Sequence, residues 1–185
     1  MDNCGLRLHD TMIYQKTGTA FASGPKSVRY TQVFEYCFIL SKGKPKTVNL
    51  IQDKKNAWAG IHSWGNATSR TKTGEMNDPG KHSKPIREFG VRNNIWIIKN
   101  SGGFGQSNKA VYKHPATMPE ALARDHILSW SNPGDVVIDP FMGSGTTARM
   151  AIETDRNYIG FEIDPEYYSI SQECVPQVTI FDTIE

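Results

Sequence analysis

The chain has 185 residues, of which 38% are hydrophobic and 22% charged, and its formal net charge is +2. This length is typical of a single domain with its own core, so we expect one domain over residues 1–185. No apolar run approaches the roughly 20 residues of a membrane-spanning helix, and residues 1–12 lack the pattern of a signal peptide, so we expect a soluble, cytoplasmic protein without membrane contact.

The three cysteines, Cys4, Cys37 and Cys174, are odd in number and far apart in the sequence. They form no C-x-x-C pair, which argues against a disulfide framework and against a zinc site. We therefore expect reduced structural thiols and no bound metal.

Residues 1–51 contain two segments rich in apolar, β-branched and aromatic residues. The first, GLRLHDTMIYQK, covers residues 5–16, and the second, TQVFEYCFILSKGK, covers residues 31–44. Both end in polar residues or in glycine and proline, which is typical of strand ends. The pattern predicts two strands, and we expect them to be neighbours in a sheet.

Residues 52–113 form the least periodic part of the chain. They are rich in Gly, Asn, Ser, Thr and Lys, and only NNIWIIKN, residues 93–100, predicts a strand. Long irregular segments inside a compact domain are usually functional or disordered. We expect Trp58, Trp64 and Trp96 in the core rather than on a surface that stacks bases.

The charge is distributed unevenly along the chain. Residues 54–113 carry 11 Lys and Arg against 3 acidic residues, whereas residues 114–185 carry 3 against 12. A basic middle beside an acidic end suggests that the middle part binds a polyanion. The alternative is a lysine-rich loop that only faces solvent.

From residue 118 onward, helical and strand patterns alternate. MPEALARDHILSWS, residues 118–131, has apolar residues at helical spacing and a proline in its first turn. A strand at 136–138, a helix at 146–154, a strand at 157–163 and a helix at 165–174 are predicted next. Such alternation is typical of parallel strands joined by right-handed crossovers, so the fold class is α/β.

The sequence VVIDPFMGSGTTARM, residues 136–150, places a glycine turn between a strand and a helix. Gly143 to Ala148 fit the loose pattern G-x-G-x-x-A, and Glu162 follows at the end of the next strand. Glycines let the backbone approach a ligand closely, and a carboxylate at that strand end can bind both ribose hydroxyls. No Lys stands before the threonine pair, as it would in a triphosphate-binding loop.

Asp139 separates two candidate cofactors. Its carboxylate, at the end of the strand that begins at Val136, would repel a pyrophosphate but would attract the ammonium and sulfonium groups of S-adenosylmethionine. A dinucleotide-binding fold that starts at this strand also needs more strands than the residues after the turn can supply. An NAD-binding oxidoreductase is therefore the remote alternative.

Residues 114–173 run HPATMPEALARDHILSWSNPGDVVIDPFMGSGTTARMAIETDRNYIGFEIDPEYYSISQE. This segment resembles the C-terminal part of the DNA amino-methyltransferases, which methylate N6 of adenine or N4 of cytosine. In permuted members of that family the catalytic region comes first, a target-recognition segment follows and the cofactor motif comes last. Residues 5–46 resemble, more loosely, the strands that follow the catalytic motif.

The resemblance implies a Rossmann-like sheet of an S-adenosylmethionine-dependent methyltransferase with a loop-rich insertion. Residues 1–51 would follow the catalytic motif, residues 52–113 would form the target-recognition insertion, and residues 114–185 would bind the cofactor. The basic insertion would mainly contact phosphates of double-stranded DNA.

The resemblance also assigns roles around the glycine turn. Residues 139–141 and 143–147 would line the methionyl end of the cofactor. Glu162 would hold the ribose and Asp164 would lie near the adenine, although Asp164 also fits the start of a helix at the following proline. HPATMP, residues 114–119, resembles the family's His-Pro-x-Gln-Lys-Pro element, which wraps the methionine moiety; Thr117 and Met118 replace its Gln and Lys. The implied cofactor-binding residues are His114, Pro115, Asp139, Pro140, Phe141, Gly143, Ser144, Gly145, Thr146, Thr147, Glu162 and Asp164.

The family's chemistry depends on a tetrapeptide, [Asp/Asn/Ser]-Pro-Pro-[Tyr/Phe/Trp], which holds the target base. A polar side chain and a backbone carbonyl accept hydrogen bonds from the amine, and the aromatic ring stacks on the base. The sequence contains no Pro-Pro pair, and NDPG at 77–80 and SNPG at 131–134 predict turns. We therefore expect no catalytic residue here, a sheet that is incomplete on its N-terminal side with an uncovered edge, and weak or no methylation by this chain alone.

Together these features predict a site-specific DNA methyltransferase that uses S-adenosylmethionine, as a fragment or as one half of a split enzyme. Its expected partners are double-stranded DNA and a second polypeptide that supplies the catalytic motif. The alternative is a non-catalytic DNA-binding or regulatory remnant that kept the fold. The target, adenine or cytosine, and the recognition sequence are left open.

Overall fold

The computed structural model describes residues 5–17, 28, 30–61, 72–75, 85–99 and 113–176. The chain divides into two compact units: Leu50–Asn93 form one, and the residues up to Asn49 together with those from Asn94 onward form the other, here called the first unit. Predictions for Cys4, Trp64 and the NDPG turn fall outside the described residues. Among the described helices, none is long and apolar enough to cross a membrane.

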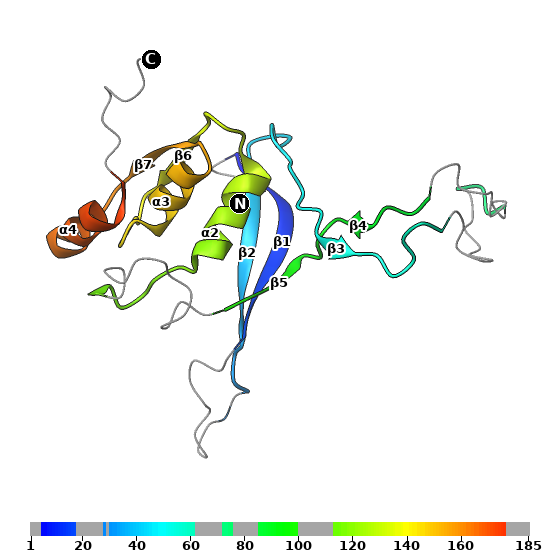
Figure 1. Cartoon of the computed structure of the whole chain (residues 1–185), viewed down its shortest axis with the longest axis horizontal. Coiled ribbons are helices and arrows are strands. Elements are labelled where there is room, and N and C mark those ends of the chain that lie inside the picture. The colour runs from blue at the N-terminus through cyan, green and yellow to red at the C-terminus, as the bar shows by residue number, and fades with distance from the viewer. Residues whose placement is uncertain are drawn as a thin grey trace. The chain divides into compact units, whose positions relative to one another are not determined.

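The first unit contains a three-stranded sheet of order β2–β1–β5 (Figure 1). Strand β1 (Arg7–Lys16) pairs antiparallel with β2 (Phe34–Ser41), which confirms that the two predicted strands are neighbours. On its other side β1 pairs parallel with β5 (Ile95–Ile98), the strand predicted inside the insertion.

One face of this sheet is buried under a helix. Met12 and Tyr14 of β1 and Trp96 of β5 are buried, and Tyr14 and Trp96 are paired in register. The centroid of the Trp96 ring lies 4.7 Å from that of His126 on helix α2 (Glu120–Trp130). Trp96 is therefore a core residue, as the sequence predicts, and α2 covers this face.

A second part of the first unit consists of a parallel pair of strands and two helices. Its elements are β6 (Val136–Asp139), α3 (Thr146–Glu153), β7 (Asn157–Gly160) and α4 (Pro165–Cys174). β6 pairs parallel with β7, so the predicted order and parallel pairing are confirmed. β7 is shorter than predicted and ends at Gly160 rather than at residue 163.

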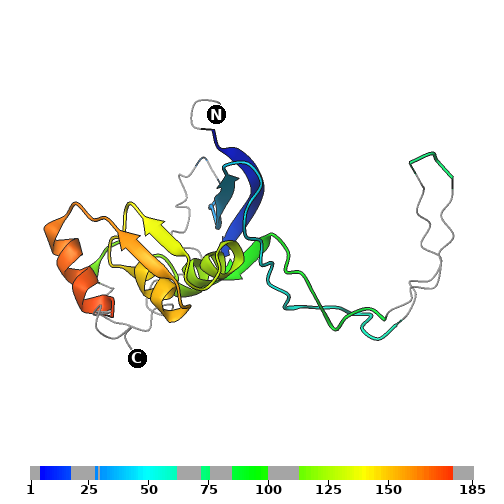
Figure 2. The same cartoon turned by 90° about the horizontal axis from the view of Figure 1, so that it is seen from above.

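Helices α2 and α3 pack against one face of the β6–β7 pair. The core here consists of buried Ala123, Ile127, Met150 and Ala151, with Val137 and Tyr158 packed against it. Because α2 also covers the β2–β1–β5 sheet, the helix-covered faces of both sheets lie on the same side of the unit (Figures 1 and 2).

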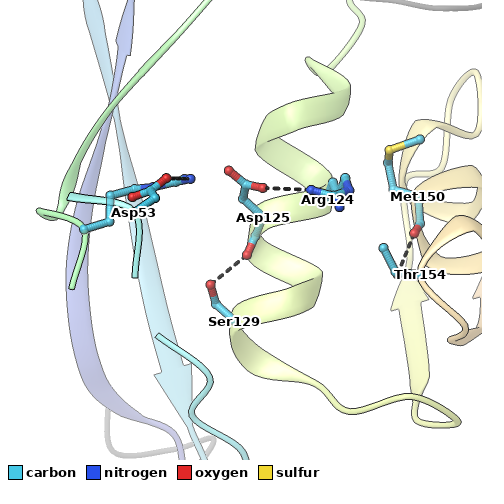
Figure 3. Close-up of polar contacts among 7 residues, drawn as sticks. Asp53, Arg124, Asp125, Ser129, Met150 and Thr154 are labelled. Atoms are coloured by element: carbon cyan, nitrogen blue, oxygen red, sulfur yellow. Dashed lines mark hydrogen bonds and ion pairs between the residues drawn. The ribbon is translucent and has the colours of Figure 1, made fainter. Parts of the chain in front are cut away.

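Side-chain hydrogen bonds hold the helices in place. The Asn49 amide donates to the Leu128 and Ser131 carbonyls at 3.3 and 3.1 Å, which ties the chain after β2 to the end of α2. The Ser129 and Thr154 hydroxyls each donate to the carbonyl four residues earlier, both at 2.7 Å (Figure 3). Such bonds supply donors to carbonyls near helix ends.

The second unit, Leu50–Asn93, contains a short antiparallel pair, β3 (Lys54–Lys55) with β4 (Phe89–Gly90). The Arg92 guanidinium donates to both oxygens of the Asp53 carboxylate, from Nε at 3.0 Å and from Nη2 at 2.5 Å, and these bonds lower the pKa of Asp53. Trp58 is 53% exposed, so the core prediction is wrong for this residue.

The bounds of this unit differ from the predicted insertion at 52–113. The difference arises because β5, which lies within that range, pairs with β1 in the first unit. The functional division of the chain at residues 51 and 113 stays a prediction.

The burial of His126 makes stability depend on pH. Burial lowers the pKa of His126 from its ordinary 6.5, and Asp125 only partly offsets this effect. Below about pH 6.5 the unfolded chain takes up a proton at His126 that the folded chain resists. The stability that neutral, buried His126 contributes is therefore fully present above that pH, and the free energy of unfolding decreases as the pH falls below it. We expect the free energy of unfolding, measured with urea, to decrease less between pH 7.5 and pH 5 for His126→Gln than for the native chain. Equal decreases would contradict this role of His126.

Candidate cofactor site

The glycine turn joins the end of β6 to the start of α3. Asp139 ends β6, and its carboxylate accepts a 2.9 Å hydrogen bond from the Phe141 amide. The Gly145 amide then donates to the Met142 carbonyl at 2.9 Å. Gly143 and Gly145 have φ values of 53° and 82°, in the left-handed region that favours glycine. The turn is therefore shaped by its sequence and by the Asp139 carboxylate.

Glu162 connects this turn to the end of the neighbouring strand β7. Its carboxylate accepts hydrogen bonds from the Asp164 amide at 2.9 Å and from the Gly143 amide at 2.8 Å. The bond from Asp164, followed by that from Gly143, lowers the pKa of Glu162. The two sequence features that indicated nucleoside binding are thus in direct contact.

His114 lies against the same turn. Its ring centroid is 4.2 Å from that of Tyr167 on α4, and its Nδ1 accepts a 3.1 Å hydrogen bond from the Ala116 amide. A Cβ atom on Gly143 would lie 3.2 Å from His114 Nε2. The structure therefore brings the predicted HPATMP segment to the turn, although Pro115 itself is exposed.

The glycines of the turn allow close packing within the chain. A Cβ atom on Gly145 would lie 2.5 Å from a methyl group of Val175, and one on Gly143 would meet His114. The sequence predicts that these glycines admit a ligand to the backbone. At these two positions the space next to the Cα atom is instead occupied by the chain's own side chains.

The start of α3 offers polar groups to a ligand. Its N-cap is Gly145, which provides no side-chain hydrogen bond to the first turn. Ser144 and Thr146 are buried, and within the described residues the Thr146 hydroxyl has no hydrogen-bond partner. Free amides at a helix N-terminus and a buried hydroxyl suit a negatively charged group.

Asp164 caps helix α4. Its carboxylate accepts hydrogen bonds from the Glu166 and Tyr167 amides at 2.8 and 3.2 Å, and Pro165 occupies the first turn. The helix-start interpretation is therefore confirmed. A contact between Asp164 and adenine stays a prediction.

Two large apolar side chains project into solvent beside these polar groups. Phe141, in the turn after β6, is 88% exposed, and Ile163, after β7, is 97% exposed. Because β6 and β7 are parallel neighbours, both residues lie just past the C-terminal end of the strand pair. The sequence predicts a cofactor contact for Phe141 but not for Ile163. The available signal for Ile163 was an apolar residue between Glu162 and Asp164, past the end of its strand.

The predicted residues are thus distributed over three adjacent segments. His114 and Pro115 precede α2, the residues from Asp139 to Thr147 form the strand end, the turn and the helix start, and Glu162 and Asp164 follow β7. Within the described ranges, no three His, Cys, Asp or Glu side chains are grouped so that they could hold a metal ion.

Comparison with known proteins adds an independent line of evidence. A sequence model of the family described as DNA methylase matches residues 1–173. The orphan methyltransferase M.BamHII of Bacillus amyloliquefaciens is 52% identical over 169 residues, which are 91% of this chain and 62% of that protein. The type II methyltransferase M.SmaI of Serratia marcescens is 31% identical over 175 residues, 94% of this chain and 48% of that protein.

Solved structures give the same picture. The crystal structure of the M1.HpyAVI-SAM complex aligns with a TM-score of 0.55 at 26% identity, covering 91% of this chain and 62% of that chain. The PvuII DNA methyltransferase, described as cytosine-N4-specific, aligns with a TM-score of 0.59 at 21% identity, covering 92% and 52%. The predicted α/β methyltransferase fold is confirmed, whereas the permuted motif order stays a prediction. The chain spans about half to three-fifths of the length of these four proteins.

Proposed function

The chain belongs to the DNA methylase family, and we propose that it binds S-adenosylmethionine at the glycine turn for the methylation of an amino group in DNA, at N6 of adenine or N4 of cytosine. The observation that carries this proposal is the pair of hydrogen bonds that the Glu162 carboxylate accepts from the Gly143 and Asp164 amides. They fix the turn after β6 and the acidic end of β7 as one surface.

Each part of the cofactor finds a chemical match on this surface. The Asp139 carboxylate would attract the ammonium and sulfonium groups, and the start of α3 with the Thr146 hydroxyl would receive the methionine carboxylate. A carboxylate oxygen has two acceptor sites, so Glu162 can accept from ribose hydroxyls while it keeps its backbone bonds. The exposed side chain of Ile163 would contact the adenine ring, and that of Phe141 would line the methionyl end.

A dinucleotide fits this surface less well. The pyrophosphate of NAD would lie at the glycine turn, beside the carboxylates of Asp139 and Glu162, and like charges at this distance repel. The sulfonium cofactor carries positive charge at the same place. We therefore favour S-adenosylmethionine over NAD.

We also propose that the second unit contacts the phosphates of double-stranded DNA. Lys54, Lys55 and Arg87 are exposed in this unit, and residues 50–93 carry 8 Lys and Arg against 4 Asp and Glu. Lysines that contact phosphates release counterions, so each contributes about one unit to the slope of log affinity against log salt concentration.

Replacing both Lys54 and Lys55 by alanine is therefore expected to weaken duplex binding and to lower that slope by about 1 to 2. Fluorescence anisotropy with a labelled duplex at several salt concentrations measures both effects. The matched control replaces Lys42 and Lys44, two exposed lysines of the first unit. A larger loss of duplex affinity in the Lys42 and Lys44 variant than in the Lys54 and Lys55 variant would refute the assignment of DNA contacts to the second unit.

We propose further that the group that holds the target base comes from a second polypeptide. This sequence contains no Pro-Pro pair and hence none of the family's target-base tetrapeptides. With labelled S-adenosylmethionine and unmethylated duplex DNA, we expect no methyl transfer by the chain alone, under conditions in which M.BamHII is active. Transfer by the chain alone would show that other residues hold the base. Salt-sensitive DNA binding without cofactor binding would favour the alternative, a non-catalytic DNA-binding remnant.

A further inference from the structure

Among the described residues, nothing covers one apolar face of the β2–β1–β5 sheet. Tyr36, Phe38 and Leu40 alternate along β2 and are exposed, and Phe38 is 61% exposed. Ile95 and Ile97 of β5 lie on the same face, because Ile95 and Tyr36 are both paired with the same residue of β1. Apolar side chains on this scale are seldom left in water by a sheet of a soluble domain.

The β6–β7 pair repeats this arrangement. Val137 and Tyr158 point to the helix-covered face, whereas Val136, Ile138 and Ile159 are exposed on the other. Ile138 is 62% exposed and lies directly beside Ile159 in the parallel register. Parallel strands in α/β proteins are normally covered on both faces. Since α2 and α3 lie on the same side of the two sheets (Figures 1 and 2), the two uncovered faces also lie on one side of the first unit.

Both sheets also end in an open edge. Among the described residues, β2 pairs only with β1, and β6 pairs only with β7. The C-terminal end of β2 and the N-terminal end of β6 line one cavity of about 400 Å³, to which Ile39, Leu40, Asp135 and Val136 contribute. An unpaired strand edge presents a row of amides and carbonyls that can pair with another strand.

Trp130, the last residue of α2, lines the cavity. Its indole N–H is itself buried and, within the described part of the chain, has no hydrogen-bond partner. A segment that enters the cavity would therefore contact the Trp130 ring together with the ends of β2 and β6.

We propose that a second polypeptide segment docks between β2 and β6, pairs as β-strand with both edges and covers the two bare apolar faces. The relatives support this occupant: 38% of M.BamHII and 52% of M.SmaI have no counterpart in this chain, since the matches cover 62% and 48% of those proteins. The inference rests on the proposed function in one respect, that the segment would also carry the target-base tetrapeptide. Strand addition gives affinity through main-chain bonds and specificity through alternate side chains.

The test is coexpression of the full chain with the part of M.BamHII that lies outside the matched region. We expect a one-to-one complex by size exclusion with light scattering. Hydrogen exchange should slow in residues 34–41 and 136–139 relative to the free chain. No complex, or a complex without slower exchange in these two strands, would overturn the proposal. Slower exchange there through self-association of the free chain would overturn it as well, because a second copy would then be the occupant.

A surface variant separates docking from folding. Phe38→Glu puts a charge on the bare face of β2 and is expected to weaken the complex by about 30-fold or more. The matched control is Tyr168→Glu on α4, which replaces an exposed aromatic side chain outside the two faces and should leave the affinity unchanged. Titration of each free variant with S-adenosylmethionine reports folding and cofactor binding separately, so failure of the cofactor proposal and failure of docking give different results. Equal affinity of Phe38→Glu and native chain for the M.BamHII segment would refute the β2 face as the docking surface.

Discussion

Replacing Glu162 by alanine is expected to lower the affinity for S-adenosylmethionine by about 100-fold or more. The substitution removes the acceptor for the Gly143 and Asp164 amides and thereby releases the glycine turn from the end of β7. It also removes the proposed acceptor for the ribose hydroxyls. Glu162→Gln retains a single acceptor oxygen, so its affinity should fall between those of the native chain and Glu162→Ala.

The control for this prediction is Glu166→Ala. Glu166 is an exposed acidic residue in the first turn of α4, and only its backbone amide takes part in the cap made by Asp164. Calorimetric titration should give native affinity for this variant. A folded Glu162→Ala that binds the cofactor as tightly as Glu166→Ala does would exclude the proposed role of Glu162.

Replacing Arg149 by alanine is expected to destabilise the first unit by about 3 kcal/mol. The Arg149 side chain is only 6% exposed; its guanidinium lies 2.5 Å from the Glu120 carboxylate of α2 and 3.7 Å from that of Glu153. Removing it leaves the half-buried Glu120 charge without its partner and opens a gap between α2 and α3. Denaturant unfolding monitored by circular dichroism measures the change.

Arg124→Ala provides the matched comparison on α2. Its side chain is 54% exposed and lies 3.7 Å from the carboxylate of the adjacent Asp125 (Figure 3). An exposed ion pair of this kind contributes little to stability, so we expect the free energy of unfolding to change by less than about 0.5 kcal/mol. Similar losses for the two arginine variants would mean that burial of the Arg149 pair does not hold α2 to α3.

The elements of the cofactor part were predictable because their patterns are local. Pro119 and the apolar residues that follow it indicate α2. The alternation of strands with helices beyond α2 indicates the parallel β6–β7 pair. The glycine turn and Glu162 were assigned together for the same reason: each follows a short apolar strand. Their direct contact through the Gly143 amide is a consequence of neighbouring parallel strands.

The remaining features depend on contacts between distant parts of the chain. The partner of β5 is β1, some eighty residues earlier, so no local pattern reveals that β5 leaves the insertion and joins the first sheet. The approach of His114 to Gly143 and of Val175 to Gly145 depends on how α4 packs, which periodicity does not encode. Trp58 has the large apolar side chain typical of a core residue, yet it is 53% exposed, because burial depends on which distant residues pack against it.

The most direct test of the cofactor assignment is a calorimetric titration of the purified chain with S-adenosylmethionine, with NAD as the control ligand. We predict saturable binding of S-adenosylmethionine, no binding of NAD, and loss of the signal in Asp139→Ala and Glu162→Ala. A folded chain that binds neither ligand, or that prefers NAD, would contradict the assignment of this turn as the methyl-donor site.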